Sequence, residues 1–229
     1  MFKKLKDGFK ALEYGRVGTF GNDISTPRTR RQAVWHFQLF DHAFLRALWT
    51  NRREIAPGVW RSNQPSPRHM AQMAAKGIKT VLSLRGEPNL SFFLLEKEAC
   101  AKHGITLTTV QLGARSAGSR TAYLQLLDTF EKIEKPLLIH CKSGADRAGL
   151  ASALWLLHME GRPLKEARKQ LSLRFMHLKS TKTGILDHIL DQYGAHLDRH
   201  GPTPVRDWIA NHYDPKYAQA SFKRYRKFP

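Results

Sequence analysis

Residues 137–149 read LLIHCKSGADRAG, and this stretch decides the fold. The apolar run LLIH at 137–140 predicts a short buried strand. The polar loop CKSGAD follows it, and the apolar run LASALWLL at 150–157 predicts a buried helix. A strand, a tight loop and a helix in this order form the unit from which α/β domains with parallel sheets are built.

The same alternation of strands and helices continues on both sides of this stretch. Further strands are predicted at 59–61, 78–84 and 105–112, and helices at 66–76, 91–103, 119–135 and 144–159. Gly77, Gly104 and Pro136 supply the stop signals that end helices. We therefore expect an α/β domain whose central, mostly parallel sheet of about four to five strands is flanked by helices.

The composition of the chain indicates which partners and which cellular compartment suit it. The 229 residues include 38 lysines and arginines against 19 aspartates and glutamates, a formal net charge of +19. Such a surface attracts phosphate groups without selecting among their carriers. Because only Cys100 and Cys141 are present, a disulfide scaffold is excluded and a reducing compartment is indicated. No apolar run approaches the roughly 18 to 20 residues that span a bilayer, so we expect a cytoplasmic protein.

Three parts of the chain differ in composition: a basic N-terminal extension with amphipathic helices (1–50), the main domain (51–215) and a basic C-terminal tail (216–229). In residues 1–12, apolar side chains recur at helical spacing among lysines, without the continuous apolar block of a secretory signal. This pattern predicts a short helix that either binds an anionic membrane surface or packs as an ordinary terminal helix. Peripheral contact with the inner face of the membrane is therefore an additional expectation.

Residues 33–49, AVWHFQLFDHAFLRALW, predict a second helix of the extension. Gln38, Asp41, His42 and Arg46 form one polar stripe, and nearly all the other side chains are apolar. A helix with so wide an apolar surface must bury it. Docking on the main domain is the favoured outcome, and insertion into a membrane interface is the alternative.

The loop after residue 140 carries the chemistry. A loop between a strand and a helix in an α/β sheet lies at the edge where such proteins bind ligands. Its successive backbone N–H groups can form a nest for an anion, and the positive end of the next helix points at the same place. A cysteine in that position, Cys141, is favoured as a thiolate, and Arg147 can bind two oxygens of a phosphoryl group. Together these groups suit attack on a phosphate ester.

The pattern His-Cys-x5-Arg in this setting resembles the cysteine-dependent phosphatases of the protein tyrosine and dual-specificity superfamily. The resemblance extends to RSNQP at 61–65, GIKTVLSLRGE at 77–87 and the stretch from Glu98 to Ile105. These segments are similar, in order and spacing, to small bacterial dual-specificity-like enzymes. The resemblance covers roughly residues 55–175 and implies that 51–215 is a phosphatase domain with the dual-specificity-phosphatase fold.

The resemblance also implies roles for single residues. Cys141 is expected as the nucleophile, and Arg147 as the side chain that binds and stabilises the phosphate. His140 is expected to support the loop. The phosphate is expected to bind to the loop residues Lys142, Ser143, Gly144, Ala145, Asp146, Arg147 and Ala148. Neither a metal nor another cofactor is expected, because loop amides and Arg147 supply the charge stabilisation.

Two departures from the family pattern concern the rate of the reaction. The family usually has Ser or Thr directly after the arginine, where this chain has Ala148. Most members also carry a general-acid Asp on a separate loop, but the corresponding segment, LGARSAGSR at 112–120, has no carboxylate. Asp146 is the first candidate for the acid, with a structural role in the loop as its alternative. Glu87 is a weaker candidate, and the absence of any acid is the third alternative.

We expect a hydrolase of phosphate monoesters that works through a phosphocysteine, first of all a phosphotyrosine or dual-specificity protein phosphatase. A phosphatase of a phosphorylated lipid, inositol or glycan is the alternative. A non-catalytic phosphate-binding pseudophosphatase is a further alternative, because of Ala148 and the missing acid loop. Charge alone suggests nucleic acid, and the sequence has no motif for its specific recognition.

Overall fold

The computed structural model describes residues 20–225 and contains a five-stranded sheet with the strand order β1-β2-β5-β3-β4. β1 and β2 form an antiparallel pair, and the pairs β2–β5, β5–β3 and β3–β4 are parallel. The strands are β1 (Arg53–Ala56), β2 (Val59–Ser62), β3 (Thr80–Ser83), β4 (Thr106–Thr109) and β5 (Leu137–His140). The predicted α/β fold with a mostly parallel sheet is confirmed.

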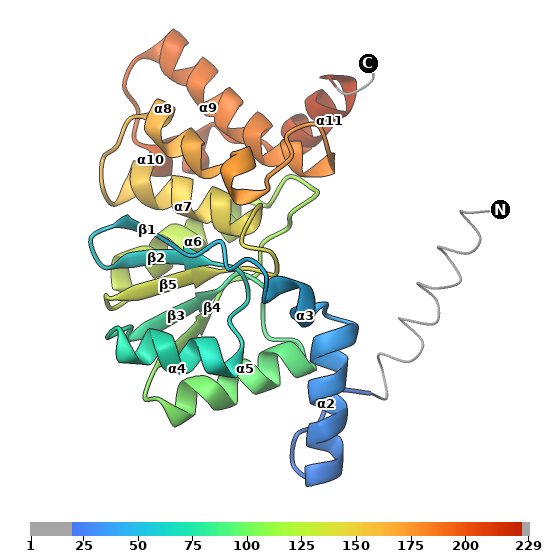
Figure 1. Cartoon of the computed structure of the whole chain (residues 1–229). Coiled ribbons are helices and arrows are strands. Elements are labelled where there is room, and N and C mark those ends of the chain that lie inside the picture. Colours follow the sequence, from blue (N-terminus) through green and yellow to red (C-terminus); the bar gives the residue numbers. More distant parts are fainter. Residues whose placement is uncertain (1–19, 226–229) are drawn as a thin grey trace, which may run out of the picture.

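Helices cover both faces of the sheet (Figure 1). On one face lie α4 (Pro67–Ala75) and α5 (Ser91–Lys102). The other face carries α6 (Arg120–Lys132), α7 (Arg147–His158), α8 (Leu164–Ala167), α9 (Ile185–His200), α10 (Val205–Asn211) and α11 (Pro215–Tyr225). Short 3-10 helices, Arg168–Gln170, Leu173–Phe175 and Lys182–Gly184, connect α8 to α9.

The central strand β5 is apolar on both sides, as a strand between two helical layers requires. Leu137 and Ile139 belong to the main core with α6, α7 and the C-terminal helices. Leu138 belongs to the smaller core under α4 and α5. Because side chains alternate along a strand, the run LLI supplies both cores at once.

The parallel register brings three loops to one edge of the sheet. Ser62 at the end of β2 and Ser83 at the end of β3 both pair with His140 at the end of β5. The residues that follow these three positions therefore meet at the carboxyl edge, where α/β proteins bind ligands. Cys141 is the central one of them.

The N-terminal extension packs on this domain, but not in the predicted way. In place of one helix over 33–49, the extension has two, α2 (Pro27–Leu39) and α3 (Ala43–Arg46). The chain turns between them at His42, whose φ is 59°. Phe37 of α2 packs in a cluster with Phe92 and Phe93 at the start of α5. The extension therefore docks on the domain through only part of its apolar surface.

Only half of the predicted polar stripe faces solvent, since His42 is exposed and Gln38 is partly exposed. Asp41 and Arg46 are buried, whereas Trp35 is 61% exposed and Leu48 is 82% exposed. The physical reason is that Asp41 and Arg46 form an ion pair of 2.7 Å with each other, so each satisfies the other's charge inside the protein.

The two ends of the chain complete the comparison with the sequence. Residues 216–225, assigned to a basic tail, belong to α11, and Ala218 and Phe222 of this helix lie in the main core. The predicted helix at 1–12 lies outside the described residues. Within residues 20–225, no helix has the length and apolar character to cross a membrane.

Candidate active site

Cys141 directly follows β5, and α7 begins at Arg147, so residues 141–146 form the loop between this strand and this helix. The Cys141 side chain is 1% exposed and borders the main core. The loop surrounds the N-terminus of a helix of 12 residues, whose dipole places positive potential over Cys141. The structure thus brings the predicted nucleophile, loop and arginine to one place at the carboxyl edge of the sheet.

The carbonyl groups of this loop are held from outside. The carbonyl oxygen of Lys142 accepts the backbone N–H of Gln64 at 3.2 Å. The carbonyl oxygen of Ser143 accepts the side-chain amide of Asn51 at 2.9 Å. In a trans peptide the C=O and the following N–H point in opposite directions. Each bond therefore turns the next residue's N–H toward the inside of the loop.

Arg61 extends this arrangement to the next two peptides. Its Nη2 donates to the carbonyl oxygens of Gly144 at 2.6 Å and Ala145 at 3.3 Å. One of the inward N–H groups, that of Ala145, reaches Ser143 Oγ at 3.3 Å. A run of N–H groups that converge in this way is a nest for an anion such as phosphate.

Arg61 is itself fully buried and is held by several partners. Its Nη1 donates to the backbone and side-chain oxygens of Gln170 at 2.7 and 2.8 Å, and its guanidinium lies 3.7 Å from the ring centroid of Phe175. Burial lowers the pKa of Arg61 to about 10, and the charges of Cys141 and Asp146 oppose this lowering. Arg61 therefore remains a cation at neutral pH and adds positive potential beneath the loop.

Gly144 is a position at which this loop requires glycine. Its φ is +74°, in the left-handed region that side chains disfavour. A Cβ there would meet the backbone N of Asn63 at 2.6 Å and the carbonyl carbon of Ser62 at 2.7 Å. The loop can lie this close to the end of β2 only without a side chain.

His140 is fully buried and has a carboxylate partner that sequence reasoning did not identify. Its Nε2 lies 2.8 Å from Oε1 of Glu96, a buried residue of α5. Its Nδ1 lies 3.4 Å from the carbonyl oxygen of Cys141. This geometry fits the predicted supporting role, because the ring lies between the buried carboxylate of Glu96 and the peptide of Cys141.

Arg147 lies at the same edge of the sheet. Its Nη1 donates to the carbonyl oxygen of Leu84 at 3.1 Å. The N–H of Leu84 in turn donates to the carbonyl oxygen of His140 at 2.9 Å. The guanidinium is thereby anchored near the end of β5, which Cys141 follows. A guanidinium has five N–H donors in total with which to bind other oxygens.

Asp146, the first candidate for the general acid, is bonded to a buried histidine. Its Oδ1 lies 2.8 Å from Nδ1 of His177, whose Nε2 lies 2.7 Å from Oδ2 of Asp187. Burial alone would lower the pKa of His177, but the hydrogen bonds and charges of the two aspartates raise it to about 9. At neutral pH His177 is therefore a cation between two carboxylates, and one oxygen of Asp146 is committed to it.

The remaining predicted positions are placed as follows. Glu87 is exposed and accepts a 2.5 Å hydrogen bond from the hydroxyl of Thr109 at the end of β4. Ala148 is fully buried in the first turn of α7, so its methyl group packs in the core and offers no hydroxyl to a leaving thiolate. In the segment 112–120, Arg120 is bonded to the carbonyl oxygen of Tyr213 at 2.8 Å.

A cluster of cations around one carboxylate borders the loop. Asp41 Oδ1 lies 2.6 Å from Nη2 of Arg85 and 3.4 Å from Nζ of Lys142. Arg46 donates to the other carboxylate oxygen and also to the carbonyl oxygen of Asp41. Burial alone would raise the pKa of Asp41, but the hydrogen bond and charge of Arg85, and the charges of Lys142 and Arg46, lower it below its usual value. This cluster places three cations against a single anion at the edge of the site.

Sequence reasoning missed most of the residues that hold the loop. A signal existed for Glu96, an acid within a largely apolar helix pattern, and for Asn51, whose φ of 48° belongs to the region that Asn tolerates best after Gly. Arg61 lay in a stretch noted only for its resemblance. For His177 no local signal is visible, because its partners follow from tertiary structure.

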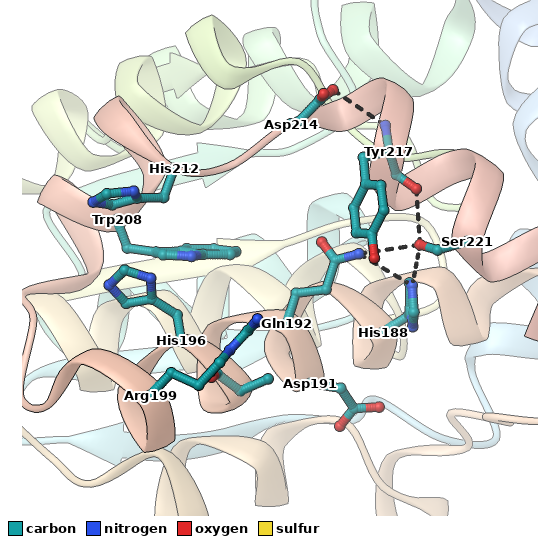
Figure 2. Close-up of a pocket in the computed structure, with 11 residues that line it drawn as sticks. His188, Asp191, Gln192, His196, Arg199, Trp208, His212, Asp214, Tyr217 and Ser221 are labelled. Carbon is teal, nitrogen blue, oxygen red and sulfur yellow. Dashed lines mark hydrogen bonds between the residues drawn. The ribbon is translucent and has the colours of Figure 1, made fainter.

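A hollow of about 340 Å³ lies between α9, α10 and α11 (Figure 2). His196, Trp208 and His212 line it side by side, with the two imidazole rings 4.5 Å apart. None of residues 141–148, which we call the phosphate loop, contributes to its lining. In the part of the chain that the structure describes, no group of His, Cys, Asp and Glu is arranged to hold a metal ion.

Comparison with known proteins places the fold. TpbA from P. aeruginosa superposes with a TM-score of 0.53 at 20% identity, covering 71% of this chain and 92% of its own. A structure of TpbA in complex with pTyr gives a TM-score of 0.54 at 19% identity, covering 71% and 91%. A putative phosphatase from Shewanella putrefaciens gives 0.52 at 15% identity, covering 64% and 92%. A search among curated proteins found no match.

At the level of sequence, residues 44–186 match the family described as DSP-PTPase phosphatase fused to NAD+ kinase. The match covers more than half of the chain, and it includes the whole phosphate loop together with Asn51, Arg61 and His177. The chain therefore belongs to this family of cysteine-dependent, dual-specificity-like phosphatases.

Proposed function

We propose that the chain hydrolyses phosphate monoesters through a phosphocysteine on Cys141. The observation that carries this proposal is the outward anchoring of the loop carbonyls by Gln64, Asn51 and Arg61. It preorganises the N–H groups for an anion before any substrate binds, so no reorganisation is needed during the reaction. The buried thiol of Cys141, at the start of this loop, is then the proposed nucleophile toward a bound phosphorus atom.

The reaction has two steps. First, the Cys141 thiolate attacks phosphorus, an S–P bond forms, and the P–O bond to the leaving group breaks. The leaving oxygen takes a proton from an acid and departs as an alcohol or phenol. Second, water attacks phosphorus, gives up a proton to the conjugate base of that acid, and the S–P bond breaks. This releases inorganic phosphate and the thiolate, while loop amides and Arg147 stabilise the equatorial oxygens in both steps.

Asp146 is the proposed proton donor to the leaving oxygen, and His177 is the proposed source of that proton. The imidazolium of His177 points its Nδ1–H at Oδ1 of Asp146. A proton that passes from the imidazolium to this carboxylate and then to the leaving oxygen leaves His177 neutral until solvent reprotonates it. In the alternative structural role, the same contact only fixes the loop. Glu87 is the weaker candidate, since Thr109 already donates to it.

For the substrate we propose a phosphoprotein, with phosphotyrosine first. A phenol with a pKa of about 10 leaves with less protonation than an alkoxide, which suits a site whose segment 112–120 has no carboxylate. The relative TpbA has been crystallised with pTyr. A phosphorylated lipid, inositol or glycan is the second candidate. Lys142 favours it: its side chain is 39% exposed, and the one carboxylate near it, Asp41, is already paired with Arg46 and Arg85, which leaves positive charge for a substrate with more than one negative group.

The proposal is tested with an aryl phosphate, whose leaving group needs little protonation. Cys141→Ser should reduce kcat by at least about 10³-fold, whereas the matched variant Cys100→Ser should keep turnover, because Cys100 lies buried under α4 and α5. Trapping of the phosphoenzyme by rapid acid quench and mass spectrometry should add one phosphate to the peptide with Cys141. Full activity of Cys141→Ser would refute the mechanism.

The non-catalytic alternative has its own outcome in this experiment. A wild-type protein that binds vanadate or phosphate but releases no phosphate from aryl phosphate between pH 5 and 8 is a binding module. Release of phosphate from a panel of phosphopeptides and phospholipids then separates the two substrate classes.

A further inference from the structure

Large apolar side chains that are exposed gather in two segments of this protein. Among residues 20–224, every such side chain except Met159 and Tyr217 lies within 34–48 or within 173–178. Leu48 is 82% exposed and Leu173 is 74% exposed. Exposed apolar side chains concentrated in this way mark a surface that contacts a partner or a membrane.

The two segments meet at the mouth of the candidate active site. Asn51, three residues after Leu48, donates through its side-chain amide to the carbonyl oxygens of Ser143 at 2.9 Å and Phe175 at 3.0 Å. Phe175 lies between the two exposed residues Arg174 and Met176. We use the term apolar rim for five exposed side chains on the two segments that Asn51 joins to the loop: Phe44, Leu45, Leu48, Leu173 and Met176.

α2 continues this surface from the rim. Arg28, Arg31, Trp35 and Leu39 are all exposed and share one face of the helix at 3.6 residues per turn. The opposite face, with Phe37, packs on the start of α5. α2 therefore presents a stripe in which two arginines are followed by two apolar side chains, the residue types that bind an anionic membrane interface.

The charge around the apolar rim indicates what covers it. Between residues 24 and 53 the chain has one acid, Asp41, which is buried and paired. Between 167 and 186 it has no acid, but it has Arg174 and Lys179, both exposed. An apolar surface whose own segments carry exposed cations and a single, buried acid is complementary to a bilayer with anionic lipid.

We propose that the apolar rim and the outer face of α2 dock on an anionic membrane surface and hold the phosphate loop against it. The orientation of the loop rests on the proposed phosphatase function, but the docking itself does not. Exposed leucines that insert among acyl chains bury apolar area, and the arginines of α2 and Arg174 remain at the level of lipid phosphates. The phosphate groups within reach of Cys141 would then be those presented at the membrane.

Vesicle flotation tests the docking with the full chain. The probe is a vesicle of phosphatidylglycerol and phosphatidylcholine, compared with a vesicle of phosphatidylcholine alone. We expect strong binding to the anionic vesicle and weak binding to the neutral one. Leu48→Glu combined with Leu173→Glu should reduce binding to anionic vesicles at least about tenfold, the factor expected for the loss of even one buried leucine. Tyr217→Glu, at an exposed apolar position away from the rim, is the matched control and should bind as the wild type does.

Two further readouts separate the outcomes. Turnover of a soluble aryl phosphate should be equal in wild type and in the Leu48→Glu, Leu173→Glu variant, which shows that the variant folds. Binding should also persist in Cys141→Ser, so that failure of the catalytic proposal leaves this test intact. The docking proposal is overturned if the wild type does not bind anionic vesicles. It is also overturned if the double variant still binds them, because the contact then lies elsewhere, for example in residues 1–19. It is equally overturned if light scattering shows a wild-type dimer that the double variant converts to a monomer.

Discussion

Arg61 donates a 2.6 Å hydrogen bond to the carbonyl oxygen of Gly144, a residue 83 positions later in the chain. The bond joins the end of β2 to the middle of the phosphate loop. It lies on the side of the loop away from the nest, so Arg61 shapes the site without facing the substrate. The cost of burying this guanidinium is offset by carbonyl oxygens and by the ring of Phe175.

Arg61→Lys keeps the positive charge but cannot bond the carbonyls of Gly144 and Gln170 together, because an ammonium lacks the planar fork. We expect a fall in kcat/KM for aryl phosphate of about 10²-fold, the cost of a small displacement in a site of this kind. We also expect a loss of about 2–4 kcal/mol in the free energy of unfolding, measured with urea. Wild-type turnover in Arg61→Lys would show that the loop is held by its other contacts.

Gly144→Ala tests the close approach of the loop to β2. The new Cβ would lie 2.6 Å from the backbone N of Asn63, and the left-handed φ of +74° adds strain. Because backbone atoms cannot move aside as a flexible side chain does, the loop must shift. We expect kcat/KM to fall at least about 10²-fold while circular dichroism stays that of the folded protein.

The matched control for this loop variant is Gly161→Ala. Gly161 also has a positive φ, +58°, but a Cβ there meets no atom within 4 Å. It should cost about 1 kcal/mol of stability and leave turnover unchanged. Equal losses of activity in the two variants would mean that a side chain at a positive φ is sufficient to lower the activity, and that the contact of the loop with β2 is not needed to explain it.

The fold was readable from sequence because its signals are local. The run LLI at 137–139 is apolar on both faces, and helix stops such as Gly104 fall where the periodic pattern ends. The loop was readable because Cys141 and Arg147 are six residues apart and the strand and helix on either side of them are unmistakably apolar. In both cases a window of about a dozen residues contains the whole signal.

The support of the loop was not readable, because its parts are far apart in the chain. Asn51 and Ser143 are separated by 92 positions, and Arg85 and Asp41 by 44. Periodicity placed Asp41 and Arg46 on one polar stripe of a single helix and predicted burial of the apolar remainder. In the structure each charge finds an opposite charge inside, which makes burial of the pair tolerable and leaves Leu48 and Trp35 outside.

His177 gives a prediction about stability and pH. Its pKa is raised from 6.5 to about 9 by Asp146 and Asp187 against the effect of burial. The stabilisation is therefore fully present below pH 6.5 and is lost as pH rises through about 9. We expect His177→Gln to lower the free energy of unfolding by on the order of 3 kcal/mol at pH 6, and by much less at pH 9.5. Urea denaturation of both proteins at the two pH values measures this; a difference that does not depend on pH would contradict the charged state of His177.

The same variant separates the two roles of Asp146. If His177 supplies the proton that Asp146 delivers, His177→Gln should lower kcat for an alkyl phosphate about 10²-fold or more. For an aryl phosphate with a good leaving group, kcat should change little. A purely structural contact would lower both rates by the same factor, so the ratio of the two rates decides between proton delivery and loop support.

Asp41→Asn tests whether the N-terminal extension is held by charge. The carboxylate of Asp41 neutralises Arg46 and Arg85, and with its loss the buried Arg46 is left without a counter-ion. We expect a loss of about 3–5 kcal/mol in the free energy of unfolding. Limited proteolysis should also cut faster between α2 and β1, because the extension is released.

Glu98→Gln is the matched control for Asp41→Asn. Its pair with Arg30 also joins the extension to α5, but the two side chains are 45% and 44% exposed, so the loss in the free energy of unfolding should stay below about 1 kcal/mol. Because the low pKa of Asp41 is a property of the folded state, its contribution should be present near neutral pH and should disappear as pH falls below the ordinary value of 3.8. Equal stability of Asp41→Asn and wild type at pH 7 would mean that apolar packing of Phe37 on α5, and not the buried ion pair, holds the extension in place.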